Sequence, residues 1–177
     1  MKLKQHFLLV LYFFAAIGLA NAQNPADFKL ESATDQSEFT LSKAKGKYVV
    51  LHFLLKTECP FCIKQTNSYM TKAKTLPNVL QVYIKPDDKK DIIGWQTKLS
   101  SDSRASTEPI YMDPGAKLAD QFKIPDGYMF HNQVVHYPAL VLLGPDGKEV
   151  FRYIGKNNTD RYSFEQLAAK IQELSRK

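Results

Sequence analysis

Cysteine is scarce in this sequence, and so is any local concentration of charge. Only Cys59 and Cys62 occur among the 177 residues, which is too few for a small domain stapled by disulfides. The net charge of +6 comes from basic residues scattered along the chain, and without a basic, aromatic-laced stripe we expect no nucleic-acid partner. No internal repeat or low-complexity segment is present. The length and the apolar content of 44% suit one globular domain with a sizeable core.

Long hydrophobic runs are absent except at the N-terminus. Residues 7–19 are almost uninterruptedly apolar, follow Lys2 and Lys4, and precede the small-x-small sequence that ends at Ala22. This is the pattern of a secretory signal peptide with cleavage after Ala22. The alternative is an uncleaved membrane anchor, but the run is shorter than the ~20 residues that a membrane span needs.

The N-terminal pattern divides the chain in two. We expect residues 1–22 to be a signal peptide and residues 23–177 to be one folded domain. No cysteine follows the apolar run, which excludes a lipoprotein modification at the cleavage site. The mature protein is then periplasmic or secreted, where thiols tend to be oxidised. It meets a membrane only through the signal peptide, before cleavage.

The two cysteines form the sequence Cys59-Pro60-Phe61-Cys62, directly after an apolar run over residues 48–55. The run predicts a buried strand, and Pro60 suits the first turn of a helix, where its missing N–H costs nothing. The sulfurs then lie near a helix N-terminus, where unpaired N–H groups favour a thiolate over a thiol. The spacing indicates dithiol–disulfide exchange, which requires neither a metal nor another cofactor.

The other elements follow from periodicity, caps and breakers. Residues 24–42 suggest one or two short peripheral strands, whereas residues 127–137 show no clear pattern. The succession predicts an α/β fold in which the first crossovers make a parallel portion and a hairpin adds an antiparallel edge. We expect strands at 48–55, 79–84, 109–112, 139–143 and 149–154, and helices at 60–76, 87–99, 113–124 and 163–174.

From residue 25 to residue 174 the sequence resembles the thioredoxin superfamily, specifically its redoxin branch, which holds peroxiredoxins and exported thioredoxin-like oxidoreductases. The resemblance implies the thioredoxin fold, a central mixed β-sheet flanked by helices. It also implies that Pro138 is a cis-proline opposite the helix N-terminus of the CxxC motif, leaving the backbone of Tyr137 free to pair with a substrate. The residues that carry the resemblance are Gly46-Lys47, Cys59-Pro60-Phe61-Cys62, the small helix after Asp113, and Tyr137-Pro138.

The motif assigns a role to each cysteine. Cys59, nearer the helix end, attacks a substrate disulfide as a thiolate, and Cys62 resolves the mixed disulfide. The two form the redox-active disulfide. The partners are client proteins with cysteines or disulfides and a redox partner that recycles the pair. The expected substrate-binding residues are Pro60, Phe61, Tyr137 and Pro138.

The first alternative is a peroxiredoxin-like thiol peroxidase. The peroxiredoxin motif Pro-x-x-x-Thr-x-x-Cys would place its cysteine on Cys62, its threonine on Cys59 and its proline on Leu55. The arginine that helps hold the peroxide lies two residues before the position of Pro138, where this chain has His136. These three departures favour disulfide exchange over peroxide reduction.

Two further alternatives remain open. The pair could be a structural disulfide or two inert core thiols. A copper chaperone could bind Cu(I) through Cys59, Cys62 and a histidine, either His131 or His136. Such chaperones carry the pattern Cys-x-x-x-Cys, which has one more residue between the cysteines than this chain has.

The remaining candidates carry weaker signals. Lys56 and Glu58 flank the pair, and Lys56 either stabilises a thiolate or is simply solvated. No carboxylate occurs in the region of His52, where thioredoxins have a buried acid. His52 itself is expected to be a hydrogen-bonded core residue. Aromatic residues that could form an apolar rim for a polypeptide substrate are Tyr128, Phe130 and Tyr137.

Overall fold

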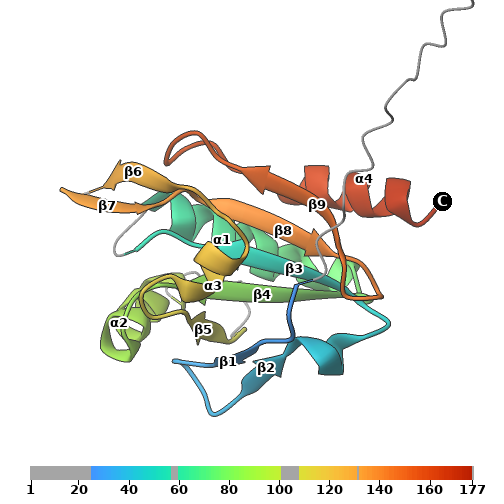
Figure 1. The fold of residues 1–177 in the computed structure, drawn as a ribbon, viewed down its shortest axis with the longest axis horizontal. Helices are drawn as coiled ribbons and strands as arrows, with labels where there is room; N and C mark the ends of the chain where they lie inside the picture. The colour runs from blue at the N-terminus through green and yellow to red at the C-terminus, as the bar shows by residue number, and fades with distance from the viewer. Residues whose placement is uncertain (1–24, 57–59, 101–107, 131, 177) are drawn as a thin grey trace, which may run out of the picture.

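The computed structural model describes residues 25–56, 60–100, 108–130 and 132–176. A five-stranded sheet in the order β5-β4-β3-β8-β9 forms the centre of the molecule (Figure 1). β3 pairs in parallel with β4, and β4 with β5, whereas β8 and β9 run antiparallel. This mixed sheet confirms the expected fold. The strands are β3 Tyr48–Phe53, β4 Val79–Lys85, β5 Ile110–Met112, β8 Ala139–Leu143 and β9 Glu149–Ile154.

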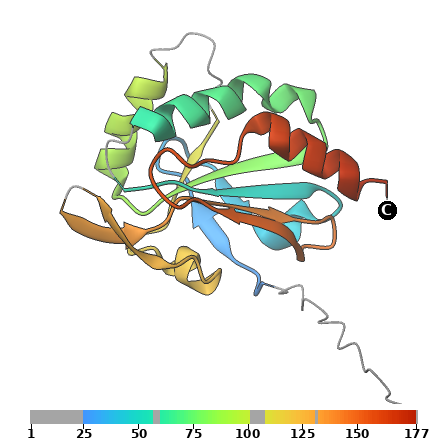
Figure 2. The same cartoon turned by 90° about the horizontal axis from the view of Figure 1, so that it is seen from above.

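Helices cover both faces of the sheet (Figure 2). One face carries three helices, α1 (Pro60–Lys72), α2 (Lys89–Ser100) and α4 (Phe164–Leu174), and the short helix η2 (Ala73–Thr75) continues α1. The opposite face is covered by α3 (Lys117–Gln121), by the two-stranded sheet of β1 (Lys29–Glu31) and β2 (Glu38–Thr40), and by the short helix η1 (Leu41–Ala44).

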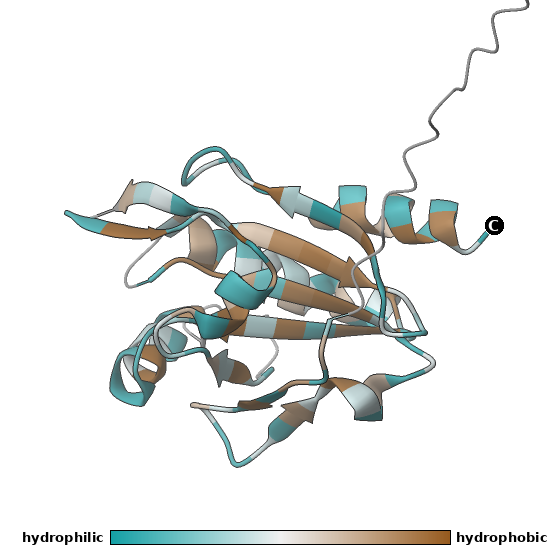
Figure 3. Ribbon diagram, in the orientation of Figure 1, coloured by the Kyte–Doolittle hydropathy of each residue, from teal (hydrophilic) through white to brown (hydrophobic). Residues whose placement is uncertain are grey.

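The sheet has a hydrophobic core on each face, which explains why β3 is apolar throughout. Successive side chains of a strand point to opposite faces. Val50 packs with the three-helix layer, while Val49 and Leu51 pack with the α3 layer. The central strands are accordingly hydrophobic along their length, whereas the helices are hydrophilic on their outer sides (Figure 3). A doubly covered strand needs this continuous apolar run.

Side-chain hydrogen bonds hold the first turns of three helices. α2 and α4 begin within two residues of their predicted starts, whereas α3 begins at Lys117, four residues after its predicted start. Ser163 accepts a hydrogen bond from the N–H of Gln166, whose side chain bonds back to the N–H of Ser163, so α4 starts with a complete capping box. The carboxylate of Asp88 accepts from the N–H of Asp91 at 2.9 Å in the first turn of α2. Asp113 serves α3 through the N–H groups of Leu118 and Ala119.

The segment without a clear sequence pattern is a β-hairpin, β6 (Asp126–Phe130) with β7 (Gln133–His136). A bulge at Gly127, whose φ is +108°, interrupts the pairing. Met129 and Val134 lie opposite each other and are 60% and 63% exposed. Because apolar residues occur here on an exposed face, period-two alternation does not reveal the strands.

Within the described ranges, no helix is long and apolar enough to span a membrane. The expected signal peptide, residues 1–22, lies outside the described residues.

Candidate functional site

The site begins where α1 starts, at the carboxyl end of β3. Pro60 is the first residue of α1, and Cys62 lies in its first turn, among N–H groups that have no partner within the helix. Cys62 is 0% exposed and disulfide-bonded. Residues 57–59, which include Glu58 and Cys59, lie outside the described residues. The nucleophilic role of Cys59 therefore stays a prediction.

Arg161 brings a positive charge to Cys62. Its Nη2 donates to Sγ of Cys62 at 3.2 Å and to Oδ1 of Asn158 at 3.2 Å. Burial lowers the pKa of Arg161 to about 10, so the guanidinium stays charged at neutral pH. A fixed cation beside a sulfur stabilises its thiolate form. The geometry thus favours a reactive sulfur at Cys62.

The loop that carries Arg161 is held by its own side chains. Oδ1 of Asn157 accepts from the N–H groups of Thr159 and Asp160 at 2.9 and 3.0 Å. The carboxylate of Asp160 accepts from the N–H of Lys156 at 2.9 Å and from the hydroxyl of Tyr153 in β9. These bonds fold the loop back onto the strand it leaves, so Arg161 is presented by an ordered turn.

Gly155 allows the loop to pack this closely. A Cβ atom at Gly155 would lie 2.2 Å from the carbonyl oxygen of Asp160 and 3.0 Å from Cγ of Pro138. No other residue type fits without moving the backbone. The N–H of Gly155 donates to the carbonyl of Pro138 at 2.8 Å. The loop is therefore seated against the start of β8.

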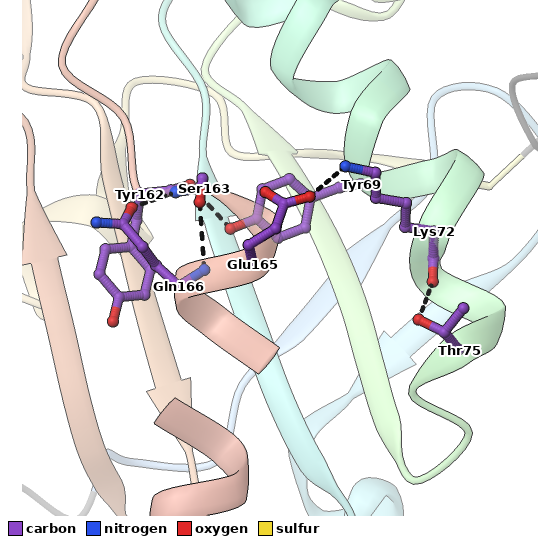
Figure 4. Close-up of polar contacts among 7 residues, drawn as sticks. All are labelled: Tyr69, Lys72, Thr75, Tyr162, Ser163, Glu165 and Gln166. Carbon is purple, nitrogen blue, oxygen red and sulfur yellow. Dashed lines mark hydrogen bonds and ion pairs between the residues drawn. The ribbon is translucent and has the colours of Figure 1, made fainter. Parts of the chain in front are cut away.

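Tyr162 fastens the other end of the loop to α1. Its carbonyl accepts from the hydroxyl of Tyr69 at 2.9 Å and from Nε2 of Gln65 at 3.2 Å. Figure 4 shows Tyr69 reaching from α1 to Tyr162, next to the Ser163 cap of α4. Arg161 thus lies between two attachments, one to β9 and one to the helix that carries Cys62.

The expected cis bond before Pro138 is wrong. None of the peptide bonds among the described residues is cis, so the bond between Tyr137 and Pro138 is trans. The N–H of Tyr137 donates to the carbonyl of Pro125 at 2.9 Å, and its carbonyl accepts from Nδ1 of His136 at 2.7 Å. The trans form is the ordinary preference, and the N–H of Tyr137 is already bonded within the protein, so it is not free to donate to a substrate strand.

Pro138 nevertheless lies beside the site. It is buried and lines a cavity of about 10 Å³ together with Arg161 and Asp160. Such a cavity is large enough for one water-sized molecule. The sequence analysis placed Pro138 opposite the start of α1; in the structure it lies beside Arg161, whose guanidinium contacts Cys62.

Phe61 is the exposed residue between the cysteines. Its side chain is 46% exposed and lines a groove of about 380 Å³ between α1 and the start of α4, which Lys64, Arg161 and Tyr162 also line. Pro60 lies on another side of α1 and does not line this groove. Of the two intervening residues, only Phe61 therefore faces a hollow that includes Arg161.

The aromatic rim is present in part. The rings of Tyr128 and Tyr137 pack with centroids 5.6 Å apart, and the charge of Tyr128 acts on the pKa of Arg161. Phe130 ends β6. The β6–β7 hairpin therefore lies beside the site, at the end of the sheet where α1 begins (Figures 1 and 2).

His52 is a core residue, as its strand predicts. It is 3% exposed, stacks on Tyr83 with centroids 4.8 Å apart, and hydrogen-bonds through Nε2 to Oε1 of Gln81 at 2.8 Å. Burial lowers the pKa of His52 to about 4. The ring is therefore neutral at pH 7 and holds the strand in place.

The histidines proposed as copper ligands do not form a site in the described part of the chain. His136 is buried and its Nδ1 is engaged by the carbonyl of Tyr137. His131 lies outside the described residues. Among the described residues, no group of three or more His, Cys, Asp or Glu side chains could hold a metal ion.

Arg161 is the site residue that the sequence analysis missed. It lies 99 residues from Cys62 in the chain, in a polar loop without periodicity. The only local signal is a run of turn-forming residues, Asn157 to Asp160, between a strand and a capped helix. That run predicts an ordered loop but says nothing of what the loop faces.

A sequence model described as the AhpC/TSA family matches residues 22–150 of this chain. The match covers Cys62 and Pro138 and stops before Arg161. No curated protein matches the chain in sequence.

Solved structures share the fold at low sequence identity. A yeast mitochondrial 1-Cys peroxiredoxin superposes with a TM-score of 0.74 at 12% identity, over 87% of this chain and 75% of its own. AhpC of Enterococcus faecalis gives 0.72 at 16% identity, over 87% and 91%. A putative protein disulfide isomerase of Bacteroides thetaiotaomicron gives 0.59 at 20% identity, over 87% of each chain. At these identities the likeness concerns the fold alone.

Proposed function

Since this chain belongs to the AhpC/TSA family of thiol peroxidases and oxidoreductases, we propose that it is a thiol peroxidase whose reacting sulfur is that of Cys62. The observation that carries the proposal is the contact of 3.2 Å between Nη2 of Arg161 and Sγ of Cys62. A guanidinium at this place stabilises the attacking thiolate and the negative charge that develops on a departing oxygen.

The two cysteines reduce one peroxide, and an external dithiol then completes the cycle. The Cys62 thiolate attacks one peroxide oxygen; the S–O bond forms, the O–O bond breaks, and the departing oxygen takes a proton to leave as water or an alcohol. Cys59 then attacks the sulfenic sulfur of Cys62, forming the disulfide and releasing water. An external dithiol supplies the two electrons that restore both thiols.

Arg161 removes one of the three objections to a peroxidase. The motif comparison places His136 where peroxiredoxins have arginine, but Arg161 brings a guanidinium to the sulfur from another part of the chain. The hydroxyl and the proline of the motif are still replaced by Cys59 and Leu55. A sulfur with one of the three groups should react with peroxide, but more slowly than with all of them.

Dithiol–disulfide exchange is the second candidate, because Phe61 is exposed between the cysteines. Its side chain borders the groove along α1, which gives a client protein an apolar contact beside Cys59. The complete burial of Cys62 also suits a resolving cysteine, which a client does not need to reach. The direction of exchange depends on the reduction potential of the pair.

Single-cysteine variants test the peroxidase. With the reduced Cys59→Ser variant, we expect one equivalent of hydrogen peroxide to be consumed and a sulfenic acid at Cys62 to be trapped by dimedone. The Cys62→Ser variant should consume none. Peroxide consumption that persists in Cys62→Ser and disappears in Cys59→Ser would contradict the assignment of the reacting sulfur.

The same variants distinguish exchange. If exchange is the activity, Cys59→Ser abolishes the reduction of insulin disulfides and Cys62→Ser accumulates mixed disulfides with client proteins. Parent protein that reduces insulin but does not turn over peroxide in the presence of a dithiol would replace the first proposal with the second.

We also propose export and a recycling partner. Export is supported by the pattern of residues 1–22. A recycling dithiol or thiol partner is supported by the balance of the reaction, and the yeast peroxiredoxin is resolved through glutathione and thioredoxin systems. Mass spectrometry of protein from the exported fraction, with an N-terminus at Gln23, tests the first proposal.

A further inference from the structure

A buried ion pair lies at the end of β4, outside the site described above. Nζ of Lys85 is 2.9 Å from Oδ2 of Asp87, and the two side chains are 1% and 0% exposed. The ammonium also lies 4.7 Å from the centre of the Trp95 ring, within the range of a cation–π contact. Burial lowers the pKa of Lys85, and Asp87 opposes that effect.

Lys85 reaches from this pair to the strand that leads to the cysteines. Its Nζ donates to the carbonyl of Leu55 at 2.7 Å, a bond that is itself buried. Leu55 is the second residue after β3, is 0% exposed, and belongs to the same hydrophobic cluster as Cys62. The next described residue, Lys56, is the last before the segment that contains Cys59.

The backbone itself cannot continue this attachment. The N–H of Leu54 donates to the carbonyl of Ile84 at 2.9 Å, and the residue that follows β4 is Pro86, which has no N–H to continue the ladder. The Lys85 side chain therefore supplies a donor where the ladder of hydrogen bonds between β3 and β4 ends.

Leu55 is a position where restraint matters. It stands where the peroxiredoxin motif has a proline, whose ring would fix the local backbone. A leucine places no such restriction on the backbone. Anchoring its carbonyl from a neighbouring strand restricts the same stretch of chain by other means.

The pair is too costly to be explained by packing alone. Removing two charges from water carries a desolvation penalty, and apolar residues of similar volume are often at least as stable. The presence of a buried lysine and aspartate therefore needs an explanation other than stability, which methionine and leucine would provide equally well. The bond to Leu55 is such a reason, because an apolar side chain cannot make it.

We propose that Lys85 is a positioning residue for the redox centre: paired with Asp87, it holds the carbonyl of Leu55 and so fixes residues 54–56, the described segment after β3, whose two leucines pack in the same hydrophobic cluster as Cys62. This inference rests on the proposed function only in that a thiolate at the cysteines does the chemistry. Loosening the segment weakens the contacts that stabilise the thiolate, and the apparent pKa of the cysteine pair rises.

The test replaces the pair without leaving a lone buried charge. In the Lys85→Met/Asp87→Leu double variant we expect unfolding near that of the parent. The apparent thiolate pKa, followed by ultraviolet absorbance during a pH titration of the reduced protein, should rise by about half a unit, which is about a threefold fall in the ratio of thiolate to thiol. Val82→Ala, a buried change on the same strand, is the control that lowers stability without moving this pKa.

A parent-like thiolate pKa in the double variant would overturn the proposal, as would an equal rise in Val82→Ala. Should the double variant not fold, Asp87→Asn keeps the Lys85 donor for Leu55, and the proposal requires its thiolate pKa to stay within about 0.2 of the parent. A rise of half a unit there would overturn it. Absence of peroxide turnover in the parent would defeat the proposed peroxidase and leave the titration interpretable.

Discussion

Two cations are withdrawn from water near the start of α1, and the protein treats them differently. Lys85 is fully buried and matched by the carboxylate of Asp87 at 2.9 Å. Arg161 is half-buried, and its described hydrogen bonds run to the neutral oxygen of Asn158 and to the sulfur of Cys62. One positive charge is balanced at all times, whereas the other is directed at an atom that is negative only as a thiolate.

The two cations therefore have different roles: Lys85 holds the backbone, and Arg161 acts on the reacting sulfur. A balanced pair gains nothing further when a thiolate forms, so Lys85 acts through the backbone it anchors. Arg161 contacts the sulfur itself, with Nη2 3.2 Å from Sγ of Cys62, so this interaction strengthens when the sulfur is charged. Substitution should therefore affect stability at Lys85 and reaction rate at Arg161.

The largest expected effect is on stability. Lys85→Met leaves Asp87 buried without its partner, and we expect the free energy of unfolding to fall by about 3–5 kcal/mol, measured by urea denaturation. Lys117→Met, at an exposed lysine of α3, should change it by about 0.5 kcal/mol or less. A loss below about 1 kcal/mol for Lys85→Met would mean that the pair is not a balanced unit.

His52 is a third buried basic residue, and unlike Lys85 and Arg161 it is neutral at pH 7 in the folded protein. Burial lowers its pKa from 6.5 to about 4, so between these values the unfolded chain binds a proton that the folded protein does not. Stability is then complete above pH 6.5 and falls as the pH drops toward 4, by at most about 3 kcal/mol from this residue.

The His52→Phe variant should reduce that fall, compared by urea denaturation at about pH 7 and about pH 4.5. Burial also lowers the pKa of His136, so a smaller dependence of the same sign remains in the variant. An identical decrease in parent and variant would show that His52 is protonated in the folded state.

At Arg161 we expect a loss of rate. Arg161→Met should lower kcat/KM for hydrogen peroxide by about 100-fold, because the donor that stabilises the attacking sulfur and the developing charge is lost. Arg161→Lys keeps the charge but not the fork of donors, and should lose less. The free energy of unfolding serves as the control, since a rate loss explained by unfolding of either variant would remove the distinction from Lys85.

The smallest expected effect concerns Gly155. Gly155→Ala places a methyl group against the carbonyl of Asp160, so the loop must shift and carry Arg161 away from the sulfur. We expect kcat/KM to fall by about tenfold through misplacement. Gly144→Ala is the matched change in the same hairpin, where the nearest atom is a side-chain carbon of Val150 at 3.1 Å. An equal loss in both variants would argue against a specific role of the Gly155 contact.

The sheet and its helices could be predicted because their signals are local. The apolar run of β3, the breakers around α1 and the Ser163–Gln166 box of α4 each carry enough information to place an element. The β6–β7 hairpin could not be predicted, because Met129 and Val134 are apolar on an exposed face.

The site could be predicted only on the side of α1. Spacing alone pointed to Cys62, whereas Arg161 reaches it through a fold that brings together residues 99 positions apart. The peptide isomer before Pro138 was inferred from resemblance, yet it follows from tertiary contacts such as that between Tyr137 and Pro125. Asp87 and Asp88 look alike in the sequence, but one is buried in an ion pair and the other caps α2.

Because Gly155 packs tightly against Asp160, the connection between β9 and α4 must keep its length for Arg161 to stay in place. Adding or deleting a single residue there would leave both flanking elements intact and still move the guanidinium off its target. A change in the length of this short connection would therefore alter the reactivity of the sulfur without changing the sheet or the helices. Transferring this connection to a related protein, with its cysteines unchanged, should place a guanidinium beside the sulfur in the same way.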